Sequence, residues 1–183
     1  KYKGSKTIND FADQVADASI AILDRFNEQG VEWVQFDEPS LVTDLTQEDV
    51  ALFTALYEKV LAHKGNVKVL LQTYFGDIRD SYEEVVGLDF DGIGFDFIEG
   101  KQTVELLERY GFPADKTLFA GVLNGKNIWT RDPWLSVSST MQKVWEESIK
   151  SWNHSIPLAS LSRMYWLCLI ANHYCHLTRW TRP

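Results

Sequence analysis

Cysteine is scarce in this sequence, and so are basic residues and long apolar runs. The only two cysteines among 183 residues are Cys168 and Cys175, too few for a disulfide framework. No apolar run is long enough to cross a bilayer, and the first four residues contain no signal-peptide core. Acids outnumber bases by 26 to 18, which argues against non-specific binding to nucleic acid or to an anionic membrane. Together these absences predict a cytoplasmic protein.

Glycine-rich phosphate loops are missing as well. No G-x-G-x-x-G sequence opens a helix after an expected strand, so dinucleotide binding has no support. The sequence shows neither an internal repeat nor a low-complexity segment. With 45% hydrophobic and 24% charged residues, the chain has the composition of ordinary globular material. Its length suits one domain with a core, or part of a larger domain.

The composition changes sharply near residue 131. Residues 1–131 hold 23 acids and 13 bases, a net charge of −10, whereas residues 132–183 hold 3 acids and 5 bases, a net charge of +2. Five of the seven tryptophans and both cysteines lie in the later segment. The change predicts two parts, a domain over residues 1–131 and a tail of uncertain status over residues 132–183.

Helical and strand patterns alternate along the first part. Helical spacing of apolar residues predicts helices over residues 8–26, 46–61, 82–86 and 101–110, and strands are expected over residues 31–36, 67–73, 90–98 and 117–122. Such alternation predicts an α/β fold with a parallel sheet and crossover helices. Short strands with polar residues at their carboxyl ends favour a partial (β/α)8 TIM-type barrel of about four βα units. The tail is expected to be mainly helical or irregular.

Acidic residues end two of the expected strands. Asp37 and Glu38 follow the apolar run over residues 31–36, and Asp96 falls near the end of another strand. The carboxyl ends of parallel strands carry the chemistry in barrel folds, so these three residues are the candidate substrate-binding residues. A structural role is the alternative for each, with Asp37 and Glu38 held by backbone groups and a neighbouring arginine, and Asp96 capping a helix. For Asp37 and Glu38 the structural role is favoured.

Other polar residues support a site less well. Tyr74, Asn124 and Asn127 at strand ends are interpreted as turn or packing residues, and Gly121 and Gly125 as backbone devices. His63 ends a helix, where the dipole favours a cation. The tail contains five metal-like side chains without the tight spacing of a zinc site, so no metal ligand is predicted. These five are His154, Cys168, His173, Cys175 and His176.

Three segments in register resemble one enzyme family. They are Gly-Val-Glu-Trp-Val-Gln-Phe-Asp-Glu-Pro over residues 30–39, Leu-Gln-Thr-Tyr-Phe over residues 71–75, and Gly-Val-Leu-Asn-Gly-Lys-Asn-Ile-Trp over residues 121–129. Their order and spacing are similar to the amino-terminal barrel of the cobalamin-independent methionine synthases. The resemblance covers roughly residues 1–130 and identifies the chain as an internal piece of that barrel.

The resemblance implies a reaction for the parent protein. The family moves a methyl group from 5-methyltetrahydropteroyltri-L-glutamate to L-homocysteine, giving methionine, without cobalamin. Its zinc ion favours the homocysteine thiolate, and the ligands of that zinc lie in a carboxyl-terminal barrel that is missing here. The implied partners of the parent are therefore folate polyglutamate, homocysteine and that second barrel. The fragment alone is expected to be inactive.

The resemblance ends near Trp129, where the composition changes. We favour the hypothesis that the tail is a frame-shifted translation of the same gene, because the codons of Leu158-Ala159 and of residues 163–165 can hide a cysteine and a His-Val pair at about the family spacing. The alternative is a genuine helical tail that begins at Asp132-Pro133. Sequencing the coding DNA from the codon of Asn124 onward decides between them. If the neighbouring reading frame does not encode the continuation of the barrel, the frame-shift hypothesis is excluded.

Two further functions stay open. One is a non-catalytic half-barrel that serves as an interaction or structural module. The other is a different barrel enzyme that binds through Asp37 and Asp96, such as a decarboxylase related to uroporphyrinogen decarboxylase. The segment from Asn124 to Trp129 favours the methyltransferase over the decarboxylase.

Overall fold

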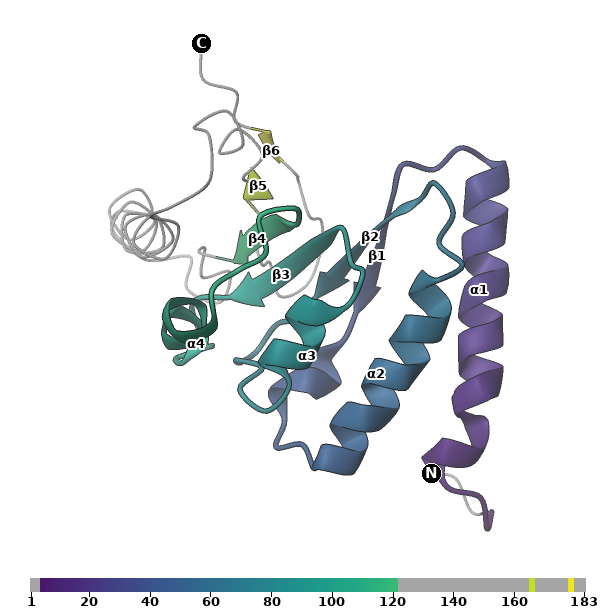
Figure 1. The fold of residues 1–183 in the computed structure, drawn as a ribbon, viewed down its shortest axis with the longest axis horizontal. Helices are drawn as coiled ribbons and strands as arrows, with labels where there is room; N and C mark the ends of the chain where they lie inside the picture. Colours follow the sequence, from purple (N-terminus) through teal and green to yellow (C-terminus); the bar gives the residue numbers. More distant parts are fainter. Residues whose placement is uncertain (1–3, 122–164, 167–177, 180–183) are drawn as a thin grey trace, which may run out of the picture.

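Strands and helices alternate along the chain, as Figure 1 shows. The computed structural model describes residues 4–121, 165–166 and 178–179. The helical elements, including two short 3-10 helices (η), are η1 (Ile8–Phe11), α1 (Ala12–Glu28), η2 (Pro39–Val42), α2 (Gln47–Leu61), α3 (Tyr82–Gly87) and α4 (Thr103–Tyr110). The strands are β1 (Trp33–Asp37), β2 (Lys68–Gln72), β3 (Gly92–Asp96), β4 (Thr117–Gly121), β5 (Tyr165–Trp166) and β6 (Thr178–Arg179).

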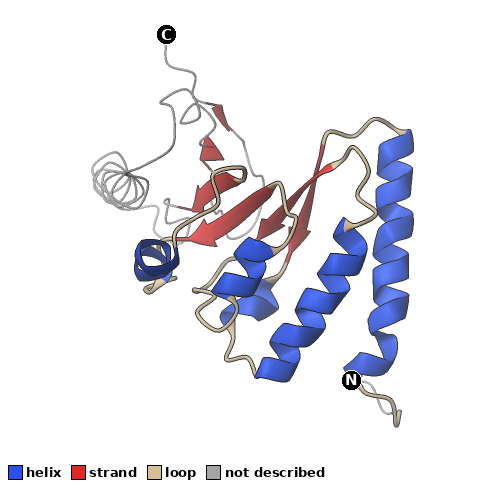
Figure 2. Ribbon diagram, viewed as in Figure 1, coloured by secondary structure: helices blue, strands red, loops and turns tan. Residues whose placement is uncertain are grey.

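The strands form one sheet in the order β1-β2-β3-β4-β5-β6. Neighbouring strands from β1 to β5 are parallel, and β5 pairs with β6 in antiparallel orientation. Helices connect the first four strands, and Figure 2 shows the helices beside the sheet. The prediction of an α/β fold with four βα units, as in part of a barrel, is confirmed over residues 4–121.

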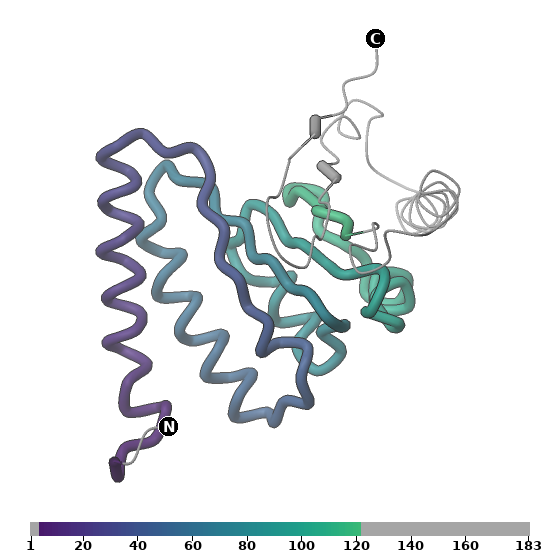
Figure 3. Tube along the Cα trace, turned by 180° about the vertical axis from the view of Figure 1, so that it is seen from behind, coloured from purple at the N-terminus to yellow at the C-terminus, as the bar shows by residue number. Residues whose placement is uncertain are grey.

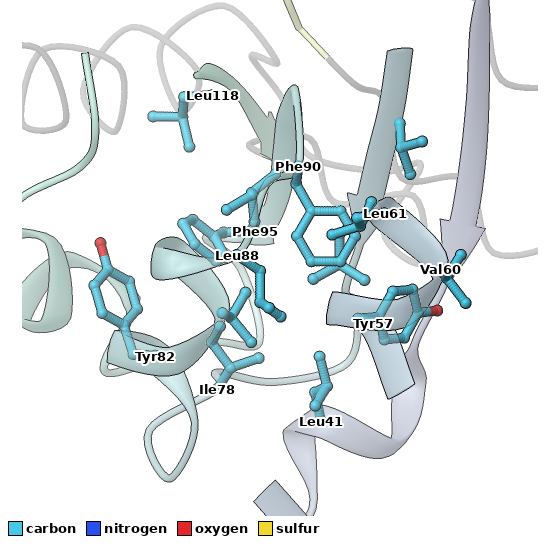
Figure 4. Packing of buried hydrophobic residues seen from close by; sticks show 14 of the residues in the cluster. Leu41, Tyr57, Val60, Leu61, Ile78, Tyr82, Leu88, Phe90, Phe95 and Leu118 are labelled. Carbon is cyan, nitrogen blue, oxygen red and sulfur yellow. The ribbon is translucent and has the colours of Figure 1, made fainter. Parts of the chain in front are cut away.

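The core lies between the helices and one face of the sheet. Alternate strand residues point toward the helices and are fully buried, among them Val69, Leu71 and Ile93. Figure 4 shows Tyr57 of α2 close to Phe90, and their ring centroids are 5.2 Å apart. The other face of β1 to β4 carries the remaining residues of each strand, because successive side chains of a strand alternate between faces. That second face includes Asp37, whereas its neighbour Phe36 contacts Tyr57.

The helix starts follow the sequence signals. Thr46 and Asp49 form a capping box at α2, since the Thr46 hydroxyl accepts from the Asp49 backbone N–H and the Asp49 carboxylate accepts from Thr46 N. Gly30 adopts φ +69° in the turn after α1, as a left-handed stop requires. The expected first helix is divided, because Ile8–Phe11 forms the 3-10 turn η1 before α1.

The glycines of β3 allow close approach of neighbouring side chains. A Cβ atom on Gly94 would lie 2.0 Å from Gln72 Oε1, and one on Gly92 would lie 2.7 Å from a ring carbon of Phe119. The register with β2 and β4 runs through both glycines without a bulge. These glycines therefore serve close packing of the neighbouring side chains, and they mark no bulge.

Most of the predicted tail lies outside the described residues, including the helix start at Asp132-Pro133 and the five metal-like side chains. Within 132–183 only β5 and β6 are described, and they extend the sheet by two short strands, with β5 next to β4 and β6 next to β5. In the part of the chain that the structure describes, no helix is both long enough and apolar enough to cross a membrane.

Candidate functional site

The predicted residues gather at one edge of the sheet, where the parallel strands end. Asp37 is the last residue of β1, Gln72 the last of β2 and Asp96 the last of β3. Glu38 follows Asp37, and its backbone N–H donates to Gln72 O at 2.9 Å, which extends the pairing of β1 with β2. The sheet thus brings all three candidate acids to the carboxyl edge. Their contact with a substrate stays a prediction.

Asp37 and Glu38 point to opposite faces of the sheet. Asp37 is exposed, and its Oδ1 accepts a hydrogen bond from Gln35 Nε2 at 2.7 Å. Gln35 and Asp37 are two residues apart on one strand, so they share a face. Because β1 continues through Asp37, Glu38 projects toward the helices. Of the two carboxylates, Asp37 is the one available to a ligand.

Glu38 is held by the helix layer. Its Oε1 accepts a short hydrogen bond from the hydroxyl of Tyr57 on α2, and its Oε2 lies 3.4 Å from the donor Ser40 Oγ. Burial and the neighbouring Glu38 carboxylate raise the pKa of Tyr57, so its hydroxyl keeps its proton. The structure therefore shows a structural partner for Glu38, and that partner is a tyrosine where an arginine was expected.

Asp96 fastens two loops to each other. It is only 3% exposed, its Oδ1 accepts from the backbone N–H groups of Ile98 and Glu99 at 2.7 and 2.9 Å, and its Oδ2 accepts from Phe75 N at 2.9 Å. Its carbonyl also accepts from Thr103 Oγ1 at 2.9 Å. The side chain does not cap α4 directly, as had been considered, because it binds the loop before that helix and the loop after β2.

The loop after β2 presents two aromatic rings. Phe75 is 57% exposed and has φ +72°, the left-handed region that a bulky residue rarely adopts. The Tyr74 and Phe75 rings pack edge to face, with centroids 4.9 Å apart. Partial burial, and then the charges of Asp37 and Glu38, raise the pKa of Tyr74. The hydrogen bond from Phe75 N to Asp96 holds this backbone in its unusual conformation.

Gln72 is a site residue that the sequence reasoning missed. It stands in register with Asp37 on β1 and with Gly94 on β3, and it is 1% exposed. Its Nε2 donates to Thr73 O at 2.7 Å, but its Oε1 has no hydrogen-bond donor within the described residues. A signal existed, because Lys68, Leu70 and Gln72 alternate with the apolar residues that face the core.

Two of the remaining predicted residues, His63 and Gly121, lie within the described residues, and neither adds a side chain to this edge. His63 lies just beyond α2, at the opposite edge, where its Nδ1 is 2.9 Å from Lys59 O. Gly121 is the last residue of β4 and has no side chain to offer. Asn124, Gly125 and Asn127 lie outside the described residues. Within the described ranges, no group of three or more His, Cys, Asp or Glu side chains is arranged to hold a metal ion.

Comparison with known proteins identifies relatives of this chain. The family model described as "Cobalamin-independent synthase, N-terminal domain" matches residues 1–148. A Lactococcus lactis subsp. lactis protein is 52% identical over 128 residues, and a Campylobacter jejuni protein is 49% identical over 131 residues. Both are named 5-methyltetrahydropteroyltriglutamate–homocysteine methyltransferase.

The matches cover most of this chain but only a small part of each relative. The matches take in 70% and 72% of this chain, but only 17% of the length of either relative. A second Lactococcus lactis protein, from subsp. cremoris, is 57% identical over 112 residues, with 61% of this chain and 15% of the relative covered. On the match to residues 1–148, the chain belongs to the cobalamin-independent synthase family, through its N-terminal domain.

Proposed function

We propose that this chain is part of the N-terminal barrel of a methyltransferase that moves a methyl group from 5-methyltetrahydropteroyltri-L-glutamate to L-homocysteine. The observation that carries the proposal is the identity of about half of all aligned residues to proteins that bear this name. The parallel sheet agrees with a barrel, and its carboxyl edge gathers Asp37, Glu38 and Asp96. In the parent this barrel helps to hold substrate against the catalytic barrel.

We place the chemical step outside this chain. The zinc ion that we propose for the parent supplies Lewis acidity toward the homocysteine thiol, and no cobalamin takes part. The described residues do not fit zinc, because they offer no suitable group of His, Cys, Asp or Glu side chains. We therefore assign the described residues only the binding of substrate at the carboxyl edge, with Asp37 as the exposed acid, in a protein of the cytoplasm.

An activity assay tests this assignment. The 183-residue chain, incubated with L-homocysteine, the triglutamyl methylfolate and zinc, is expected to form no methionine above a protein-free control. A full-length relative, assayed in parallel under the same conditions, is expected to turn over. Methionine formation by the 183-residue chain would show that the chemical step resides in it. An inactive relative under conditions where its fold is intact would contradict the proposed reaction.

A second function is favoured by a separate observation. Ile8, Val15 and Ile22 lie seven residues apart on η1 and α1, and they are 74%, 50% and 52% exposed. Strand β1 stands at the end of the described sheet, with no strand beyond it within residues 4–121. An exposed apolar stripe on η1 and α1, together with an open edge at β1, favours a non-catalytic half-barrel that binds another chain.

A further inference from the structure

Two aromatic rings form a corner at the carboxyl edge of the sheet. Tyr74 and Phe75 follow β2, and their ring planes meet at 88° with the centroids 4.9 Å apart. Phe75 is 57% exposed, so a large part of its ring is open to solvent. The faces of aromatic rings carry partial negative charge, and two rings at a right angle present two such faces to one small group. The pair is therefore a candidate binding surface.

The backbone around Phe75 is strained but firmly anchored. Phe75 has φ +72°, a conformation that a bulky residue rarely adopts. Its N–H donates to Asp96 Oδ2 at 2.9 Å. Just before the pair, Thr73 donates from its N and its Oγ1 to Gly94 O at 3.0 and 2.8 Å. Strained residues persist where the surrounding structure fixes them, and they cluster at functional sites. The corner is thus formed before any ligand arrives.

The charge next to this corner is negative. Partial burial, and then the charges of Asp37 and Glu38, raise the pKa of Tyr74, so both carboxylates act on that ring. Within residues 4–121, no lysine or arginine forms an ion pair with either carboxylate. The hydrogen-bond donor to Glu38 is the neutral hydroxyl of Tyr57, which leaves the charge in place. Negative charge beside two ring faces favours a cation.

The chemistry of the corner selects the kind of cation. Ring faces accept no strong hydrogen bonds, and Asp37 Oδ1 already accepts from Gln35 Nε2. A primary ammonium group has three N–H donors, which need strong acceptors in place of water. A quaternary ammonium group has no N–H donor, and its methyl groups pack directly against aromatic faces. The corner therefore suits a quaternary ammonium group better than a primary one.

We propose that Tyr74 and Phe75 form a binding site for a quaternary ammonium group, with Asp37 and Glu38 supplying the opposite charge. The methyl groups pack against the two ring faces, and the carboxylates attract the cation through space without hydrogen bonding to it. This site does not depend on the proposed methyl transfer, since it rests on described residues of this chain alone. It gives the strained and exposed Phe75 a ligand-binding role.

Titration of the 15N-labelled 183-residue chain with choline chloride tests the site. The matched probe is 3,3-dimethyl-1-butanol, which has the same shape but a carbon atom in place of the charged nitrogen, and sodium chloride keeps the ionic strength constant. We expect only choline to shift the backbone amide signals of Tyr74 and Phe75, in a saturable manner. No saturable shift with choline, or an equal shift with the alcohol, would overturn the proposal.

Variants separate binding by the rings from general attraction to an acidic edge. Phe75→Leu and Tyr74→Leu each keep an apolar side chain but lose a ring face, so each is expected to weaken choline binding roughly tenfold. Tyr110→Leu, which removes another partly exposed ring at the end of α4, is the control and should bind as the wild type does. Unchanged binding in Phe75→Leu, or equal weakening in all three variants, would overturn the proposal.

A further substitution at Phe75 separates binding from folding. Phe75→Gly removes the ring and also relieves the strain at φ +72°, because glycine adopts positive φ readily. We expect this variant to fold and to lose choline binding. Binding of choline by Phe75→Gly with the affinity of the wild type would overturn the proposal.

Discussion

Glu38 shows how one contact between a strand end and a helix indicates the role of a residue. Its carboxylate receives the hydroxyl of Tyr57, which is 3% exposed, and both groups lie between β1 and α2. A hydroxyl that donates to a carboxylate forms a stronger hydrogen bond than one between neutral groups. Glu38 is half-buried, so water only partly replaces a lost donor, and that loss is measurable as stability.

Replacing Tyr57 by phenylalanine tests this contact. We expect Tyr57→Phe to lower the free energy of unfolding by about 1–3 kcal/mol, because the Glu38 carboxylate loses its hydrogen-bond donor on α2. Urea unfolding at pH 7 measures the effect. The matched control is Tyr110→Phe, since Tyr110 is 39% exposed and should change stability little. Equal stabilities of Tyr57→Phe and the wild type would show that the hydrogen bond contributes nothing.

The sequence predicted the position of these acids but not their partners. Alternation along β1 implies that Asp37 and Glu38 face opposite sides while the strand continues, which is what the structure shows. The identity of the Glu38 partner depends on how α2 packs across β1, 19 residues along the chain. The unused oxygen of Gln72 depends on the register with β3, which sequence periodicity does not specify.

Helix α2 has a start that the sequence itself signals. Thr46, followed three residues later by Asp49, indicates a capping box, and both of its hydrogen bonds are present. The hydrogen bonds that the Thr46 side chain and backbone donate lower the pKa of Asp49 below its usual 3.8. A lowered folded-state pKa adds stability above the unfolded value, and that stability is lost as pH falls through the folded-state value.

The pH dependence of an Asp49→Asn variant tests the box. We expect this variant to be less stable than the wild type at pH 7, and the difference to shrink as the pH falls below 3.8, where the Asp49 carboxylate takes up its proton. Thermal unfolding at a series of pH values measures both effects. Glu48→Gln, in the same first turn, removes an acid that lies outside the box. A pH-independent difference would mean that ionisation of Asp49 does not stabilise the helix.

The sequence predicts the presence and order of the helices and strands better than it predicts where each one begins and ends. The expected strand over residues 90–98 is only Gly92–Asp96 in the structure, because Asp96 turns its carboxylate onto the following N–H groups and ends the strand. The first helix begins later than its apolar spacing suggests, since Ile8 and its neighbours form a 3-10 turn. Apolar periodicity reports which face is buried, but hydrogen bonds between distant residues decide where an element stops.

At the scale of the whole molecule, the described part is an open sheet with helices along one side. Figure 3 views the molecule from behind. In this view β1 runs in front of α2, and α1 lies at the left of the molecule. Helices α1 and α2 lie side by side and are joined by Lys59, which pairs with Asp13 and Asp17 at 3.1 and 2.8 Å. The remaining exposed stripe of Ile8, Val15 and Ile22 is apolar surface that a second copy can cover.

Light scattering tests whether the half-barrel acts as a self-associating module. We expect a mass above that of the 21.0 kDa monomer, and we expect the double substitution Val15→Lys and Ile22→Lys to shift the population toward the monomer. The double substitution Asp24→Lys and Glu28→Lys, on the same helix but outside the stripe, controls for added positive charge. A monomeric wild type with cooperative melting would exclude the module.

Asp96 has a consequence for exchanging parts between related barrels. Its carboxylate binds the backbone of the loop after β2 at Phe75 and that of the loop after β3 at Ile98 and Glu99. The two loops therefore depend on the same side chain for their conformation. A chimaera that grafts one of them alone from a relative separates the acid from its backbone partners, whereas grafting both together keeps the joint intact.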